Sequence, residues 1–240
     1  MPIAPGDVPV IDIAGAEGPA RDRIARQIDD ALTRFGFLQI VGHGVPDDVI
    51  ERMRAACDAF FARELADKLR CLPPDPSVNR GYAPQGTEAL SYSLGADAPP
   101  DLFEAFNLGP EDMPASVLAH PRAAEFFPDN VWPDDMPDFR AALLEYFVSV
   151  RALAHRVTSL FATALGLPED FFEARTDHST DVLRVINYER RPSDGPPLPG
   201  QNRMGPHADY GIVTVLCADP VPGLEIVAPD GEWRPVVPEP

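Results

Sequence analysis

Residues 205–216 read Gly-Pro-His-Ala-Asp-Tyr-Gly-Ile-Val-Thr-Val-Leu, and this stretch decides how the fold and the chemistry are interpreted. β-Branched residues such as Ile212 and Val213 favour an extended strand, in which side chains two positions apart point to the same side. His207 and Asp209 are therefore expected to face the same way. An imidazole and a carboxylate side by side are two of the three ligands of the two-histidine, one-carboxylate triad that binds non-haem iron(II).

A His-x-Asp pair is a weak signal by itself, because the chain has 5 histidines and 38 acidic residues. The surroundings are more specific: Gly205-Pro206 precedes the pair, Gly211 follows it, and an apolar strand is expected to end at Leu216. This combination resembles the iron(II)- and 2-oxoglutarate-dependent dioxygenases of the isopenicillin N synthase-like superfamily. The alternative is a surface Asp209 that is hydrogen-bonded to a neighbouring histidine at a strand end.

The chain of 240 residues carries 20 basic and 38 acidic residues, a formal net charge of -18. Such a surface repels nucleic-acid phosphates and anionic lipid headgroups, so we expect neither nucleic acid nor a membrane as a partner. The first residues lack the pattern of a secretory signal, and no run approaches the ~20 apolar residues of a membrane span. We therefore expect a cytoplasmic protein, of unknown oligomeric state. The three cysteines Cys57, Cys71 and Cys217 lack metal-type spacing, which favours structural roles.

The N-terminal part predicts a strand at 8–13, a helix at 19–35, a strand at 37–41 and a helix at 47–62. The passage from Phe35 to Val45, which includes Gly42-His43-Gly44, also resembles the N-terminal region of the dioxygenases. We interpret His43 as a turn residue that hydrogen-bonds to the backbone, because the resemblance gives it no role as a ligand.

The middle of the chain alternates between irregular and helical segments. Residues 71–100 are rich in Pro, Gly, Ser and Asp, which predicts an ordered but irregular connection. Within it, the segment 79–82 resembles a family segment near the active-site mouth. Tyr82 is thus either a substrate-pocket residue or an aromatic side chain packed under a loop. Residues 101–106 also resemble a segment of the family, and we expect them to have a structural rather than a catalytic role. Apolar residues at steps of three or four predict a long helix at 137–165 that backs the sheet.

The segment 181–188 predicts a strand that ends at Tyr188. The resemblance implies that this tyrosine contacts the distal carboxylate of 2-oxoglutarate, and a phenol can donate to a carboxylate. The next residues, Glu189-Arg190-Arg191, depart from the prolines that many relatives have there. A tyrosine simply packed at the strand end is therefore the alternative. Farther on, Asp230-Gly231 predicts a tight turn between strands at 223–227 and 232–236.

The expected fold is mainly β with helices: a double-stranded β-helix, or jelly-roll, that is incomplete at its C-terminal side and has N-terminal and backing α-helices. We expect three consecutive regions: an N-terminal dioxygenase region at 1–100, a helical support region at 101–180, and the first part of the jelly-roll iron/2-oxoglutarate domain at 181–240. No histidine follows His207. The resemblance implies that the third iron ligand is a histidine beyond Pro240, followed by an Arg-x-Ser that binds 2-oxoglutarate.

The resemblance implies an enzyme that uses Fe(II), 2-oxoglutarate and O2 to oxidise a C–H bond of a small molecule by hydroxylation, desaturation or cyclisation. Because Asp209 is a carboxylate and leaves no ligand position open for a halide, halogenation is disfavoured. The chain would then be the N-terminal part of a longer enzyme, inactive alone. Two alternatives stay open: an oxidase of the same superfamily that does not use 2-oxoglutarate, and a catalytically inactive binding protein.

Overall fold

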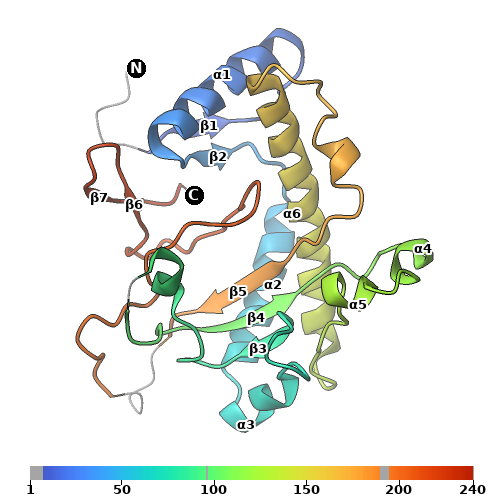
Figure 1. The fold of residues 1–240 in the computed structure, drawn as a ribbon, viewed down its shortest axis with the longest axis vertical. Coiled ribbons are helices and arrows are strands. Elements are labelled where there is room, and N and C mark those ends of the chain that lie inside the picture. The colour runs from blue at the N-terminus through green and yellow to red at the C-terminus, as the bar shows by residue number, and fades with distance from the viewer. Residues whose placement is uncertain (1–7, 96, 190–194, 240) are drawn as a thin grey trace. The chain divides into compact units, whose positions relative to one another are not determined.

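The computed structural model describes residues 8–95, 97–189 and 195–239 (Figure 1). The chain divides into two compact units, each assembled from segments that are far apart in the sequence. Unit 1 consists of Met1–Pro46, Ser149–Asp177 and Gly211–Pro240, and unit 2 of Asp47–Val148 and His178–Tyr210. The long helix α6 (Pro137–Ala164) contributes to both. The expected division into three consecutive regions stays a prediction.

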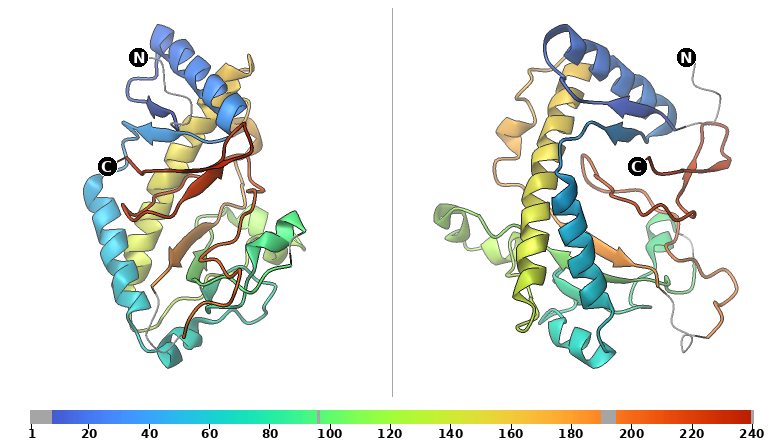
Figure 2. Two further views of the ribbon diagram at one scale, coloured as in Figure 1. Left: turned by 90° about the vertical axis from the view of Figure 1, so that its left-hand side faces the viewer. Right: turned by 180° about the vertical axis from the view of Figure 1, so that it is seen from behind.

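Unit 1 begins with a short parallel pair of strands, β1 (Val10–Asp12) and β2 (Gln39–Val41). Parallel neighbours need a crossover connection, and α1 (Gly18–Phe35) supplies it, with a proline in its first turn and Gly36 at its C-terminal end. In Figure 2 this helix runs alongside the two strands. Its buried apolar residues recur at helical spacing, as the sequence predicted: Ile24, Ala25, Ile28 and Ala31.

The turn after β2 confirms the structural interpretation of His43. Gly42 has a φ of +63°, and a Cβ atom there would collide with the carboxylate of Asp12. The Val45 N–H donates to Nδ1 of His43 at 3.1 Å, and Arg156 Nη1 donates to the His43 carbonyl at 2.8 Å. His43 is therefore bound to the backbone of its own turn and to a neighbouring arginine.

Unit 1 also contains the predicted C-terminal hairpin. Strands β6 (Glu225–Val227) and β7 (Trp233–Pro235) pair antiparallel around Asp230-Gly231. The Gly231 N–H donates to the Ala228 carbonyl at 2.8 Å, and the Ala228 N–H donates to the Glu232 carbonyl at 2.9 Å. The turn dipeptide thus marks the hairpin where the sequence placed it.

Unit 2 is built on a three-stranded antiparallel sheet of β3 (Gly81–Ala83), β4 (Glu104–Leu108) and β5 (Leu183–Asn187). Helix α2 (Asp47–Phe61) and the start of α6 cover one face of the sheet. The ring of Phe60 stacks on Phe139 with centroids 4.8 Å apart, and Phe139 meets Phe106 edge-on at 4.9 Å. These contacts confirm that the long helix backs the sheet.

Shorter elements complete the described part of the chain: α3 (Leu65–Lys68), α4 (Ala115–Leu118), α5 (Ala123–Phe126), η1 (Leu69–Cys71), η2 (Leu90–Leu94) and η3 (Glu173–Arg175). Neither α6 nor any other helix within the described residues combines the length and the apolar character that a membrane-crossing segment needs. Helices and strands are thus mixed, and the strands of the described residues form three small sheets, none of them a closed barrel.

The predicted strand within 205–216 is wrong in this structure. The backbone of these residues belongs to no sheet ladder among the described residues, and most of the side chains from Tyr210 to Leu216 are exposed. Strand propensity reflects packing against neighbouring strands as much as any backbone preference. Without a pairing strand alongside, Ile212 and Val213 do not form a strand, despite their β-branched side chains.

The half-buried carboxylate of Glu104 joins the strands of the unit 2 sheet. The Glu104 carboxylate accepts from Lys68 Nζ at 2.6 Å and from Asn187 Nδ2 at 2.9 Å, and the Tyr82 hydroxyl also donates to it. Lys68, only 1% exposed, donates to the Phe61 carbonyl as well, at 3.1 Å. All three strands and the helical segment α3 therefore meet at one charged group.

We predict that Lys68→Met lowers the free energy of unfolding by about 3 to 5 kcal/mol, because it leaves the carboxylate of Glu104, whose side chain is 12% exposed, without its cation. Arg122→Met is the matched control: it removes the cation of an exposed pair with Glu125 and should cost less than about 1 kcal/mol. Urea denaturation followed by circular dichroism measures both. Equal losses for the two variants would show that the buried pair does not stabilise the sheet.

Candidate metal centre

The structure brings His207 and Asp209 together, although the segment that carries them is not a strand. Nδ1 of His207 lies 2.9 Å from the Gly205 carbonyl oxygen. Because a carbonyl oxygen only accepts, Nδ1 carries the proton, which leaves the lone pair on Nε2. Nε2 lies 3.5 Å from Oδ1 of Asp209, and the two side chains are 30% and 50% exposed. One imidazole nitrogen and one carboxylate oxygen thus face the same space.

This donor set fits part of an iron site. Imidazole and carboxylate ligands bind first-row metals at roughly 2.0 to 2.2 Å, so two donor atoms 3.5 Å apart can share one ion. Imidazole with carboxylate is also the ligand chemistry of the non-haem iron(II) triad. Within residues 8–95, 97–189 and 195–239, no three His, Cys, Asp or Glu side chains form a group that could hold a metal. The pair therefore has the donor atoms for two of the three ligand positions of such a triad.

Tyr188 lies directly after β5, next to the segment that leads to the His-x-Asp pair. Its side chain is partly buried, with the residue 38% exposed, and its hydroxyl donates to Sδ of Met204 at 3.6 Å. The ring meets Phe103 edge-on with centroids 6.4 Å apart. Burial raises the pKa of the Tyr188 phenol, so the hydroxyl keeps its proton at neutral pH and remains a hydrogen-bond donor.

Tyr82 lies in the core of unit 2, with its hydroxyl on Glu104 and its ring 5.5 Å from Lys68 Nζ. Tyr82 is 2% exposed, as expected if it is an aromatic side chain that packs in the interior. A role for Tyr82 in the substrate pocket stays a prediction.

Asp101 lies near the His207–Asp209 site, although the sequence predicted only a structural role for it. Its carboxylate is buried, and Oδ1 accepts from the Gly205 N–H at 2.9 Å. The adjacent Leu102 N–H donates to the Asn202 carbonyl, also at 2.9 Å. No local pattern could have revealed these contacts, because the partners lie about a hundred residues apart in the chain. The single sequence signal is that Asp101 opens the family-like segment 101–106.

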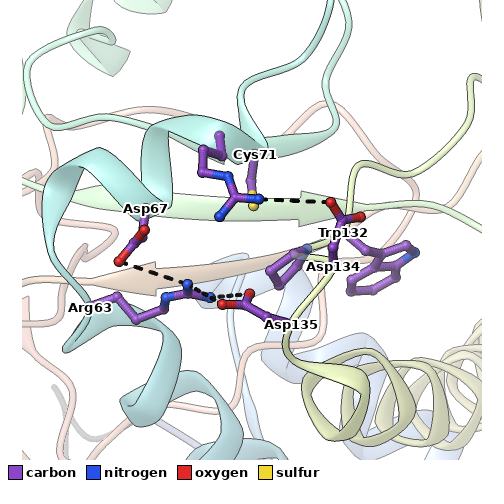
Figure 3. A pocket seen from close by; sticks show the side chains of 8 residues that line it. Arg63, Asp67, Cys71, Trp132, Asp134 and Asp135 are labelled. Carbon is purple, nitrogen blue, oxygen red and sulfur yellow. Dashed lines mark hydrogen bonds and ion pairs between the residues drawn. The ribbon is translucent and has the colours of Figure 1, made fainter.

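A small pocket elsewhere in unit 2 has paired charges and no catalytic geometry (Figure 3). It is lined by Arg63, Asp67, Arg70, Cys71, Trp132, Pro133, Asp134 and Asp135. Both terminal nitrogens of Arg63 donate to Asp135, at 2.8 and 2.7 Å, and burial raises the pKa of the Cys71 thiol. With a volume of about 50 Å³, the pocket has room for a few water molecules. We assign it a structural role.

Two family profiles match the chain in sequence order. Residues 8–135 match the N-terminal region of the non-haem dioxygenases in morphine synthesis, and residues 180–240 match the 2OG-Fe(II) oxygenase superfamily. The second match includes Tyr188, His207 and Asp209. The chain is 33% identical over 234 residues to the validamycin A dioxygenase of Streptomyces hygroscopicus, and 31% identical over 247 residues to the 2-oxoglutarate-Fe(II) type oxidoreductase hxnY of Emericella nidulans.

These matches cover 95% and 98% of this chain, but 62% and 68% of the two relatives. Among solved structures, a full-length Neurospora crassa protein in complex with alpha-KG is similar, with a TM-score of 0.79 and 25% sequence identity. That alignment covers 99% of this chain and 72% of the Neurospora protein. The structural similarity confirms the predicted fold class, a jelly-roll with helices. The sheets of the described residues do not form a closed barrel.

We predict that a thiol reagent such as iodoacetamide labels Cys217 first, because this side chain is exposed. Burial raises the pKa of Cys57 to about 12 and that of Cys71 in the same direction, so both stay protonated and unreactive at neutral pH. Mass spectrometry of the native and the urea-unfolded protein measures the order, with Cys217→Ser as control. Rapid labelling of Cys71 in the native protein would contradict its structural assignment.

Proposed function

Because the chain belongs to the 2OG-Fe(II) oxygenase superfamily, we propose that it is part of an iron(II)- and 2-oxoglutarate-dependent oxygenase. The enzyme couples the decarboxylation of 2-oxoglutarate to the oxidation of a C–H bond in a small molecule, by hydroxylation, desaturation or cyclisation. One observation carries this proposal. Nε2 of His207 and Oδ1 of Asp209 lie 3.5 Å apart, with the lone pair of Nε2 available to a metal.

His207 and Asp209 would bind Fe(II) through Nε2 and Oδ1. The third ligand is a histidine outside residues 1–240; the greater length of the curated relatives supports this assignment. The bound iron supplies the chemistry that side chains lack, the reaction of O2 with 2-oxoglutarate. The contribution of this chain is to hold the metal and the cosubstrate in a fixed orientation and to keep His207 in the Nδ1–H tautomer.

Tyr188 would donate its phenolic proton to the distal carboxylate of 2-oxoglutarate. Its raised pKa supports this role, because a donor to a carboxylate must be protonated. Its hydroxyl already reaches Met204, three residues before His207. The thioether sulfur of Met204 is a weak hydrogen-bond acceptor. The carboxylate of bound 2-oxoglutarate would therefore displace it as the acceptor of the Tyr188 hydroxyl. The similar Neurospora crassa structure, which holds alpha-KG, supports the choice of cosubstrate.

We further propose a cytoplasmic location. Cys57 and Cys71 are buried free thiols, as is typical of a compartment in which thiols stay reduced. The formal net charge of -18 supports a small molecule, rather than a nucleic acid, as the substrate.

We predict that His207→Ala and Asp209→Ala each lower iron affinity and succinate formation more than 100-fold. Loss of a residue that only supports a ligand costs about 10- to 100-fold, and loss of a ligand itself should exceed that range. Equilibrium iron binding and succinate release measure the effect in the protein extended to the length of its relatives. His43→Ala is the control and should retain the activity of the parent. Full activity of His207→Ala would exclude the proposed centre.

We predict that Tyr188→Phe raises the KM for 2-oxoglutarate about ten- to a hundred-fold, with a smaller effect on kcat. One hydrogen bond to a charged group contributes roughly 1.5 to 3 kcal/mol. The matched control is Tyr92→Phe, at an exposed tyrosine of η2, which should leave the KM unchanged. An unchanged KM in Tyr188→Phe would mean that this tyrosine does not contact 2-oxoglutarate.

A further inference from the structure

Asp101 is a buried carboxylate at the junction of three chain segments in unit 2. The residue is 2% exposed. Oδ2 accepts from the Leu90 N–H and Oδ1 accepts from the Gly205 N–H, each at 2.9 Å. The Asp101 N–H donates in turn to the Glu88 carbonyl at 2.8 Å. Because the carboxylate is shielded from water, these two backbone groups are the partners that compensate its burial.

Gly205 connects this carboxylate to the candidate metal ligand. Its N–H donates to Asp101, and its carbonyl oxygen lies 2.9 Å from Nδ1 of His207. Any side chain at this position would collide with Oγ of Ser91, which is itself buried. Gly205 is therefore held on one side by a charged acceptor and on the other by close packing against Ser91. The N–H and the carbonyl oxygen of Gly205 lie in adjacent peptide planes that meet at its Cα, so these contacts hold the backbone position from which the carbonyl group projects.

The direction of that carbonyl determines the state of the imidazole. The hydrogen bond from Nδ1 fixes both the tautomer and the ring orientation of a ligand histidine, so that Nε2 presents its lone pair to the metal. Hydrogen bonds to an ionised acceptor are roughly twice as strong as those between neutral groups. The Asp101 contact is thus the strongest hydrogen bond that the described residues make to the backbone of Gly205.

We propose that Asp101 is a positioning residue for the metal centre: by holding Gly205, it fixes the carbonyl that orients the imidazole of His207. We assign Asp101 no role as a ligand, because it is 2% exposed and each of its two oxygens accepts a backbone N–H. The inference rests on the proposed function for its effect on iron. The effect of Asp101 on the imidazole of His207 does not require a metal. The effects on the imidazole and on iron binding can therefore be tested separately.

The first experiment compares Asp101→Asn with the parent in the metal-free protein. An asparagine has the same shape, but its NH2 group cannot accept from a backbone N–H. Nitrogen-15 NMR reports which ring nitrogen of His207 carries the proton, and His207→Ala assigns the signal. We expect the Nδ1–H tautomer in the parent and a loss of that preference in Asp101→Asn. Asp134→Asn, at an exposed carboxylate, should not change the tautomer.

The second experiment measures iron affinity in the same variants. We expect Asp101→Asn to weaken iron binding about 10- to 100-fold, the usual effect of losing a group that supports a ligand, and Asp134→Asn to leave it unchanged. A folded Asp101→Asn variant with an unchanged tautomer and unchanged iron affinity would overturn the proposal. If His207→Ala binds iron normally while Asp101→Asn still changes the tautomer, the proposed function fails and the positioning role stands.

A second pair of variants keeps the test decisive if Asp101→Asn does not fold. Gly205→Ala introduces the collision with Ser91 and should disturb the tautomer and the iron affinity in the same way. Adding Ser91→Gly removes the colliding hydroxyl and should restore both, at least in part. Gly205→Ala with the tautomer and iron affinity of the parent would show that the orientation of this carbonyl does not control His207.

Discussion

The half-buried carboxylate of Glu104 makes the interactions on which unit 2 depends. It binds Lys68, Tyr82 and Asn187, so one charged group links all three strands of the sheet to a helical segment. A buried carboxylate without such partners would be strongly destabilising. Because Asn187 is the last residue of β5, the same contact also fixes the strand end from which Tyr188 projects. The position of the proposed cosubstrate residue therefore follows from the packing of the sheet.

Asp101, which precedes β4, and Glu104, which begins it, lie three residues apart and make different contacts. Glu104 joins the strands and α3, whereas Asp101 holds the loop that leads to His207. This arrangement lets a segment without strand pairing present His207, the proposed metal ligand, in a defined orientation. The loop is held by hydrogen bonds to its backbone at Asn202 and Gly205, and these come from a part of the chain that is rigidly packed.

The segment after Tyr210 shows how far local propensity determines structure. Ile212 and Val213 have the side chains of a strand, but their backbone pairs with none of the described strands. The proximity of His207 to Asp209 does not depend on that pairing, because Nδ1 of His207 is held by Gly205, two residues earlier. The predicted strand is thus wrong, whereas the two side chains that it was expected to place on one side still lie next to each other, with Nε2 and Oδ1 3.5 Å apart.

The sequence by itself determined the features that local rules govern. The helical spacing of apolar residues located α1 and α6, Asp230-Gly231 located the hairpin, and the family motifs pointed to His207 and Asp209. Only the tertiary structure decided that Lys68 meets Glu104 and that Asp101 meets Gly205. Such pairs join residues that are distant in the chain, and a charged residue has the same local signature whether it becomes exposed or buried. The packing of the segments determines the partner of a buried charged residue, since a charge can be buried only where hydrogen bonds compensate it.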